Sequence, residues 1–128
     1  MELVEFLKAN IKEGMSIDEI IDVFKQMCEI PTDDEDECIL FETGAYDFTG
    51  ENIFYFNLIR QYESEDDEYY QVFVKLCFAP DSFNTKLYDE IWSDSIDEDI
   101  YSAIKKSDSY KYAIKNKYKS ISIGIEES

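Results

Sequence analysis

The sequence predicts an α+β fold in a single domain, residues 1–128, with the element order ααβββααβ. Apolar residues recur at helical spacing near both ends of the chain, whereas residues 38–78 are rich in the alternation that β-strands show. Hydrophobic residues make up 45% of the chain, which is enough to form a core despite the many charges. We therefore expect a mainly antiparallel sheet of about four strands, with the helices segregated from the strands.

The N-terminal segment predicts a hairpin of two helices, over residues 2–13 and 17–28. Ser16 and Glu19 have the spacing of a capping box at the start of the second helix, and Pro31 prevents that helix from continuing. The hairpin is too short to bury its own apolar stripe, so we expect it to pack on the sheet.

Residues 38–43, 52–62 and 69–78 contain many β-branched and aromatic side chains and predict three strands. The two longer strands each have one apolar face, formed by Phe54, Phe56, Leu58 and Tyr62 and by Tyr70, Val72, Val74, Leu76 and Phe78. Their second faces keep several apolar residues, namely Ile53, Tyr55, Ile59, Tyr69 and Phe73. Either the C-terminal helices cover this second face, or it stays exposed for binding or dimerisation.

Residues 85–93 predict a short helix, because apolar and aromatic side chains recur there at helical spacing, and we interpret Trp92 as a core residue. A second capping box begins a helix over 96–106, and another short helix follows over 108–115. Residues 119–125 alternate again and predict a final strand that returns to the sheet.

Negative charge dominates the composition. Thirty acidic residues against twelve basic ones give a net charge of −18, concentrated in residues 1–104, because residues 105–128 hold six lysines and only three acids. Such a surface repels nucleic acids and anionic membranes, whereas it attracts basic proteins. We therefore expect a basic protein partner, and no direct contact with nucleic acid or a membrane.

The chain lacks the usual signals for export. No run approaches the roughly 20 apolar residues of a membrane span, and the first five residues carry acids where a signal peptide carries positive charge. We expect a cytoplasmic protein. Its three cysteines, Cys28, Cys38 and Cys77, form no CxxC motif and are expected to be buried, reduced thiols.

The sequence offers little for catalysis or metal binding. It contains no histidine, which removes the commonest general base and metal ligand, and it contains no glycine-rich phosphate loop. The acidic runs lack the glycine that a calcium-binding loop needs at its sixth position. We expect no enzyme activity, no cofactor and no metal site; a pair of catalytic carboxylates is the remaining enzymatic alternative.

The remaining signal is the placement of acidic residues beside aromatic ones. Tyrosine and tryptophan anchor protein interfaces, and carboxylates beside them can accept paired hydrogen bonds from arginine. The acidic runs at 33–37 and 63–68 and the aromatic residues of the central strands therefore predict a partner-binding surface. Its predicted members are Asp33, Asp34, Glu35, Asp36, Glu37, Tyr55, Glu65, Asp66, Asp67, Glu68 and Tyr69.

Residues 51–62 (ENIFYFNLIRQY) and 67–72 (DEYYQV) give the chain a resemblance to the small acidic immunity proteins of bacterial toxin systems, including those of contact-dependent growth inhibition. The resemblance rests on length, acidity, an aromatic hairpin and missing active-site residues. It implies binding to a basic toxin domain, possibly a nuclease, that is neutralised by occlusion. Two alternatives remain: a DNA-mimic inhibitor of nucleic-acid-binding proteins, and a non-catalytic module that forms homo-oligomers, for example a homodimer through the aromatic sheet face.

Overall fold

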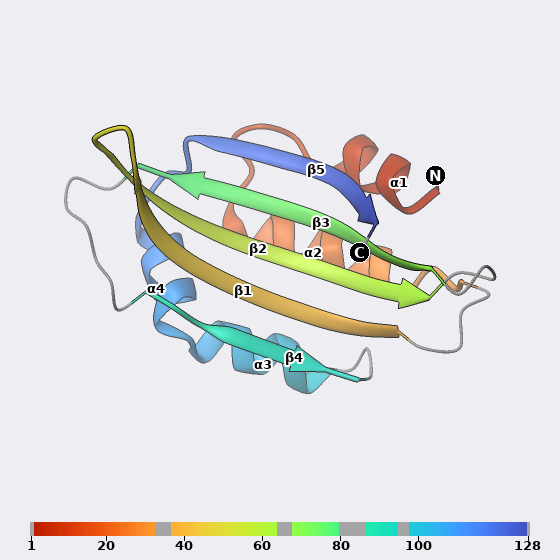
Figure 1. Cartoon of the computed structure of the whole chain (residues 1–128). Helices are drawn as coiled ribbons and strands as arrows, with labels where there is room; N and C mark the ends of the chain where they lie inside the picture. Colours follow the sequence, from red (N-terminus) through yellow and green to blue (C-terminus); the bar gives the residue numbers. More distant parts are fainter. Residues whose placement is uncertain (1, 33–36, 64–67, 80–86, 95–97, 128) are drawn as a thin grey trace.

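The computed structural model describes residues 2–32, 37–63, 68–79, 87–94 and 98–127. They form two layers, a curved antiparallel sheet and a layer of helices packed on one of its faces (Figure 1). In chain order the elements are α1 (Glu2–Asn10), α2 (Ile17–Cys28), β1 (Glu37–Phe48), β2 (Glu51–Glu63), β3 (Tyr69–Phe78), β4 (Glu90–Ser93), α3 (Glu98–Lys106), α4 (Asp108–Lys115) and β5 (Ser120–Glu127). The expected α+β class is confirmed.

The described sheet has five strands in the order β4-β1-β2-β3-β5, and each neighbouring pair is antiparallel. Strand β1 is much longer than the expected 38–43, because it continues through Gly44 to Phe48. Thr49 and Gly50 then form a two-residue hairpin turn, and both have positive φ angles, of 49° and 85°. Such a turn matches the twist of the flanking strands and so sets the register of β1 against β2.

The helix expected over residues 85–93 is wrong. Residues 90–93 form strand β4, which pairs with β1 at the edge of the sheet. Leu87 is buried and Ile91 is half-buried, so the inward residues fit a spacing of two as well as they fit a helix. A segment this short does not distinguish the two periods, and pairing with β1 decides the outcome.

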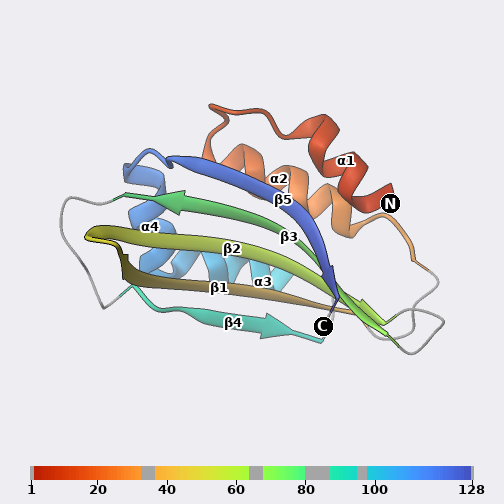
Figure 2. The same ribbon diagram turned by 45° about the horizontal axis from the view of Figure 1, so that its top comes forward.

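The four helices of the described residues lie on the same face of the sheet (Figures 1 and 2). Ser16 and Glu19 form the expected capping box at the start of α2, and α4 begins at Asp108 after the cap residue Ser107. Because α3 and α4 join α1 and α2 on this face, the alternative in which the C-terminal helices cover the second face of β2 and β3 is wrong.

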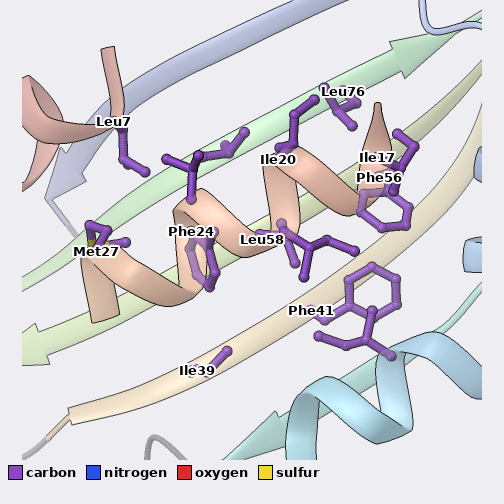
Figure 3. Close-up of a cluster of buried hydrophobic side chains, with 14 of the residues drawn as sticks. Leu7, Ile17, Ile20, Phe24, Met27, Ile39, Phe41, Phe56, Leu58 and Leu76 are labelled. Carbon is purple, nitrogen blue, oxygen red and sulfur yellow. The ribbon is translucent and has the colours of Figure 1, made fainter. Parts of the chain in front are cut away.

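The core lies between α2 and the sheet (Figure 3). Phe24 and Ile20 of α2 are fully buried against side chains of β1 and β2, where the Phe41 and Phe56 rings meet edge to face with centroids 4.8 Å apart. Each large apolar side chain buried in this way stabilises the fold by about 1.5–3 kcal/mol. The two faces of β2 and β3 are as the sequence predicts, with Phe54, Leu58 and their neighbours inward.

Arg60 connects this core to the end of α2. Its guanidinium is buried and donates hydrogen bonds to the carbonyl oxygens of Met27 at 2.8 Å and Ile30 at 2.9 Å. A cation at this position adds hydrogen bonds to carbonyl groups at the helix end, where the Met27 carbonyl also accepts from the Ile30 backbone N–H, and it complements the negative end of the helix dipole. Arg60 also forms an ion pair with Glu37 of β1 at 2.8 Å.

Candidate functional site

The face of the sheet turned away from the helices is hereafter the open face. No helix of the described chain covers it (Figure 2). All five described strands contribute alternate residues to it. Antiparallel pairing places these side chains in rows that run across the strands. The rows show which residues from distant parts of the sequence lie side by side.

One row across the open face is apolar. Leu40 of β1 lies opposite Trp92 of β4 on one side and Ile59 of β2 on the other, and Ile59 lies opposite Phe73 of β3. Ile59 is only 3% exposed although no described helix lies over it, so its neighbours in the sheet must shield it. Trp92, at the edge, is 62% exposed. The interpretation of Trp92 as a core residue is therefore wrong.

A tyrosine cluster lies beside this row and consists of Tyr46, Tyr55 and Tyr88. The rings of Tyr46 and Tyr55 have centroids 6.1 Å apart, and the Tyr88 hydroxyl donates a hydrogen bond to the carbonyl oxygen of Ala45. Burial raises the pKa of the Tyr55 phenol, with a further contribution from the charge of Glu42. Tyr55 therefore remains a neutral hydrogen-bond donor at physiological pH.

Carboxylates stand next to these aromatic side chains. Glu42 of β1 and Glu90 of β4 are direct cross-strand partners, an arrangement of like charges that destabilises a sheet. Burial raises the pKa of the Cys38 thiol, and the nearby charge of Asp94 raises it further. Neither β1 nor β4 contains a lysine or an arginine, so no basic residue of these strands offsets the acids.

These residues together form the acidic–aromatic strip of the open face. Its members are Leu40, Glu42, Tyr46, Tyr55, Tyr88, Glu90 and Trp92. Tyr88, Glu90 and Trp92 alternate along one edge, with Tyr88 56% and Trp92 62% exposed. The strip therefore presents large aromatic area and negative charge in the same place, with the Lys75 amine of β3 beside Tyr55 as a neighbouring cation.

A buried polar network holds the edge of the strip in position. The Ser109 hydroxyl lies 2.7 Å from the Thr43 hydroxyl and donates to the Asp89 carboxylate at 2.5 Å. The Ser109 backbone N–H also donates to Asp89, at 3.1 Å, which caps the first turn of α4. In return the Asp89 backbone N–H donates to the Thr43 hydroxyl at 2.8 Å. These bonds fix Tyr88 and Glu90, the neighbours of Asp89, relative to β1 and α4.

Of the predicted partner-binding residues, Tyr55 and Tyr69 both lie on the open face, at opposite ends. Tyr69 is 40% exposed and lies eight residues along β3 from Cys77, the cross-strand partner of Tyr55. At ~3.4 Å per residue, the two tyrosines are about 27 Å apart along the sheet. Glu68 is exposed beside Tyr69 and accepts a hydrogen bond from Tyr70 at 2.8 Å.

Glu37 has an internal role, because its carboxylate accepts from the buried Arg60 and from the Thr32 hydroxyl. The other predicted members, Asp33, Asp34, Glu35, Asp36, Glu65, Asp66 and Asp67, lie outside the described residues. Residues 37, 63 and 68 are the described residues of the two acidic runs, and all three lie at one end of the sheet.

No family model, curated protein or solved structure matches this chain. The function is therefore argued from the site itself. The predicted set omitted six members of the strip, namely Leu40, Glu42, Tyr46, Tyr88, Glu90 and Trp92. The alternation Tyr88-x-Glu90-x-Trp92-x-Asp94, with a period of two, is the signal that would have found its edge.

Other features of the described residues give no competing site. They contain no group of three or more candidate ligands that could hold a metal ion. No helix among them is long and apolar enough to cross a membrane. Two cavities, of about 520 and 450 Å³, lie on the helical side, where acids are mixed with lysines such as Lys117 and Lys25.

Proposed function

We propose that this chain is an immunity protein that binds a basic toxin domain on its open face and neutralises the toxin by occlusion, without catalysing a reaction itself. The observation that carries the proposal is the acidic–aromatic strip. Exposed aromatic side chains supply buried anchors, and the carboxylates between them supply acceptors for the lysines and arginines of the partner.

The size of the open face supports a specific complex. At the usual spacing of strands and residues, five strands present an area of about 25 Å by 30 Å. This is about 750 Å², close to the ~800 Å² that each partner contributes to a standard interface. The open face can therefore form a complete interface by itself.

The energetic contributions differ between the two kinds of residue in the strip. Exposed ion pairs contribute only about 0–1 kcal/mol each, so net charge alone does not give tight binding. A tryptophan that becomes fully buried in an interface contributes about 2–4 kcal/mol. We assign affinity mainly to Trp92 and the tyrosine cluster, and we assign partner choice and association rate to Glu42 and Glu90.

The DNA-mimic alternative fits the open face less well. A mimic needs carboxylates at regular spacing, in place of phosphates, so that it can bind many basic proteins. On the described open face, acids alternate with tyrosine and tryptophan, and the row through Glu42 continues with Asn57 and Lys75. The mixture favours one specific partner over a general substitute for DNA.

The experiment is co-expression of this chain with the product of the neighbouring reading frame, as the test partner, followed by measurement of cell survival and of binding affinity. We expect Trp92→Ala to weaken binding by about 30- to 1,000-fold, which corresponds to the loss of a buried anchor. Glu42→Lys should also weaken binding. It should at the same time leave folding stability unchanged or raised by about 0.2–1 kcal/mol, because it turns the Glu42–Glu90 repulsion into an attraction.

Glu13→Lys is the matched control, because it makes the same change of charge at an exposed position between α1 and α2. It should leave the affinity within about twofold, since distant exposed charges are screened by salt. Unchanged affinity in both Trp92→Ala and Glu42→Lys would exclude the strip as the binding surface. Equal binding to unrelated DNA-binding proteins would favour the DNA-mimic alternative.

A further inference from the structure

Strand β5 forms one edge of the described sheet and pairs there only with β3. An edge strand has a row of backbone N–H and C=O groups that point away from the sheet, and another strand can pair with them. This strand spans eight residues, contains no proline, and carries Ile125 with 37% of its surface exposed. The edge therefore has the length and the side chains that strand addition requires.

The sequence around this edge is symmetric in the positions of its isoleucines and carries opposite charges at its two ends. From Lys119 to Glu127 it reads Lys-Ser-Ile-Ser-Ile-Gly-Ile-Glu-Glu, with Ile123 at the centre. Reversal about Ile123 exchanges Ile121 with Ile125, and it exchanges the basic start of the strand with its acidic end. An antiparallel partner strand of the same sequence would thus meet an apolar centre and an opposite charge at each end.

We propose that two copies of this chain pair through β5, antiparallel about a two-fold axis at Ile123, and so form one continuous sheet. In this register Lys119 of each copy lies opposite Glu127 of the other, and Ile121 lies opposite Ile125. Cross-strand pairs of opposite charge and of β-branched residues both stabilise antiparallel sheets. The pairing also buries the exposed Ile125 side chain.

The contacts of Lys119 and Glu127 within one chain permit this exchange. Lys119 lies 3.6 Å from Glu51, and both side chains are more than half exposed. An exposed ion pair of this kind contributes little to stability. Lys119 can therefore exchange Glu51 for Glu127 of the second copy with little loss of free energy. Glu127 is exposed at the far end of β5, where its neighbour across the sheet is Tyr70.

This dimer is independent of the proposed immunity function. Rotation about an axis perpendicular to the sheet keeps each residue on its own face, so the open faces of both copies would lie on the same side of the joined sheet. The acidic–aromatic strip is on the β4–β1 side, at the opposite edge from β5. Edge pairing therefore leaves the strip accessible, in contrast to a dimer that buries the aromatic face.

The test is sedimentation equilibrium of the full chain at protein concentrations from about 1 µM to about 1 mM, at physiological ionic strength. We expect the wild type to dimerise reversibly. Lys119→Glu and Glu127→Lys each place like charges at both ends of the paired strands, and each should weaken the dimer at least about tenfold. The double variant Lys119→Glu/Glu127→Lys restores opposite charges and should restore the wild-type dissociation constant.

Two controls separate this interface from others. Lys105→Glu changes the net charge by the same amount as Lys119→Glu, but it lies on α3 and should leave dimerisation unchanged. Trp92→Ala should also leave it unchanged, because Trp92 is on the opposite edge of the sheet. A wild type that stays monomeric, single variants that dimerise normally, or a double variant that fails to recover would each overturn the proposal.

Disulfide trapping tests the register directly. Residue 123 is the only position of β5 that meets its own copy in this register, with Cβ atoms about 4.5–5.5 Å apart. Ile123→Cys should therefore form an intermolecular disulfide on mild oxidation, located by mass spectrometry of peptides. Ser120→Cys is exposed on the same strand but lies far from residue 120 of the second copy, so it should not form this disulfide. Equal crosslinking of the two variants would contradict the register.

Discussion

The ring of Tyr55 lies directly over Gly44, its cross-strand partner, so closely that a Cβ at residue 44 would be 2.6 Å from the tyrosine hydroxyl oxygen. Glycine at this position is what allows the ring to lie along the sheet, within 5.1 Å of the Lys75 amine. Phe73 has a similar but looser arrangement over Gly124, where a Cβ would be 3.0 Å from the ring. Two glycines, Gly44 and Gly124, thus leave room for aromatic rings to lie flat on the open face.

We expect Gly44→Ala to displace the Tyr55 ring and to lower the free energy of unfolding by about 1–3 kcal/mol, as overpacking does. The displaced ring would lose its contact with Lys75 and its place in the tyrosine cluster, so partner affinity should fall as well. Gly124→Ala should lower the free energy of unfolding by less, because the added Cβ would be farther from the Phe73 ring. Urea denaturation measures the free energy of unfolding of both glycine variants. If the clash with the ring is the cause, the double variant Gly44→Ala/Tyr55→Ala should be more stable than Gly44→Ala.

The single tryptophan provides a test of the strip that needs no partner. Trp92 is exposed beside Glu90 and Asp94, so its fluorescence should be quenched readily by neutral acrylamide. Nearby carboxylates attract cations and repel anions, so caesium should quench more efficiently than iodide at low ionic strength. Added salt should reduce this difference. Glu90→Lys should reduce or reverse it, and equal quenching by the two ions in the wild type would contradict the proposed local charge.

Arg60 is expected to be the most sensitive charged residue of the described core. Arg60→Met removes the donor to the carbonyl oxygens of Met27 and Ile30 and leaves the Glu37 carboxylate without its charged partner. Breaking such a buried pair costs about 3–5 kcal/mol, which the shift of the urea midpoint measures. Lys75→Met, which removes a cation from the open face, is the matched control and should cost about 1 kcal/mol or less.

Cys28 should make stability depend on alkaline pH. Burial raises the pKa of its thiol from 9.0 to about 11, partly offset by a hydrogen bond with Tyr101. Because the folded protein holds this proton more tightly than the unfolded chain does, the resulting stability is fully present below pH 9 and is lost as the pH rises toward 11. The loss is at most about 2–3 kcal/mol.

Cys28→Ala should therefore flatten the dependence of the unfolding free energy on pH between 9 and 11, although it lowers the absolute value by leaving a small cavity. Cys77→Ala, at a half-buried position on the open face, controls for the removal of a thiol. If Cys28→Ala leaves the pH dependence of the unfolding free energy unchanged in this range, burial does not hold the proton on the Cys28 thiol.

Local sequence signals predicted the helices well, since they depend on neighbouring residues. The capping box at Ser16 and Glu19 placed the start of α2, and the expected helix over 108–115 has the bounds of α4. The two faces of β2 and β3 followed from simple alternation. Strand β4 was missed because helix and strand periods both fit residues 85–93, and only its pairing with β1, far away in the sequence, distinguishes them.

The candidate site was predicted less completely for the same reason. Tyr55 was found because its strand is unmistakable, whereas Glu42 and Trp92 became part of a surface only when β4 joined the sheet beside β1. Glu37 was predicted as a surface acid because it belongs to a run of acids. Its pairing with Arg60, 23 residues away, could not be inferred from the run itself.

Because the described helices cover only one face of the sheet, alternate residues of each strand have different roles. In β2, inward residues such as Phe56 and Leu58 pack in the core, whereas the alternate residues Tyr55 and Asn57 face outward. Substitutions at the outward positions can change what the protein recognises and leave its internal packing intact. Under the proposed immunity function, relatives of this chain could therefore match a changing toxin by substitutions at these outward positions, while the fold stays the same.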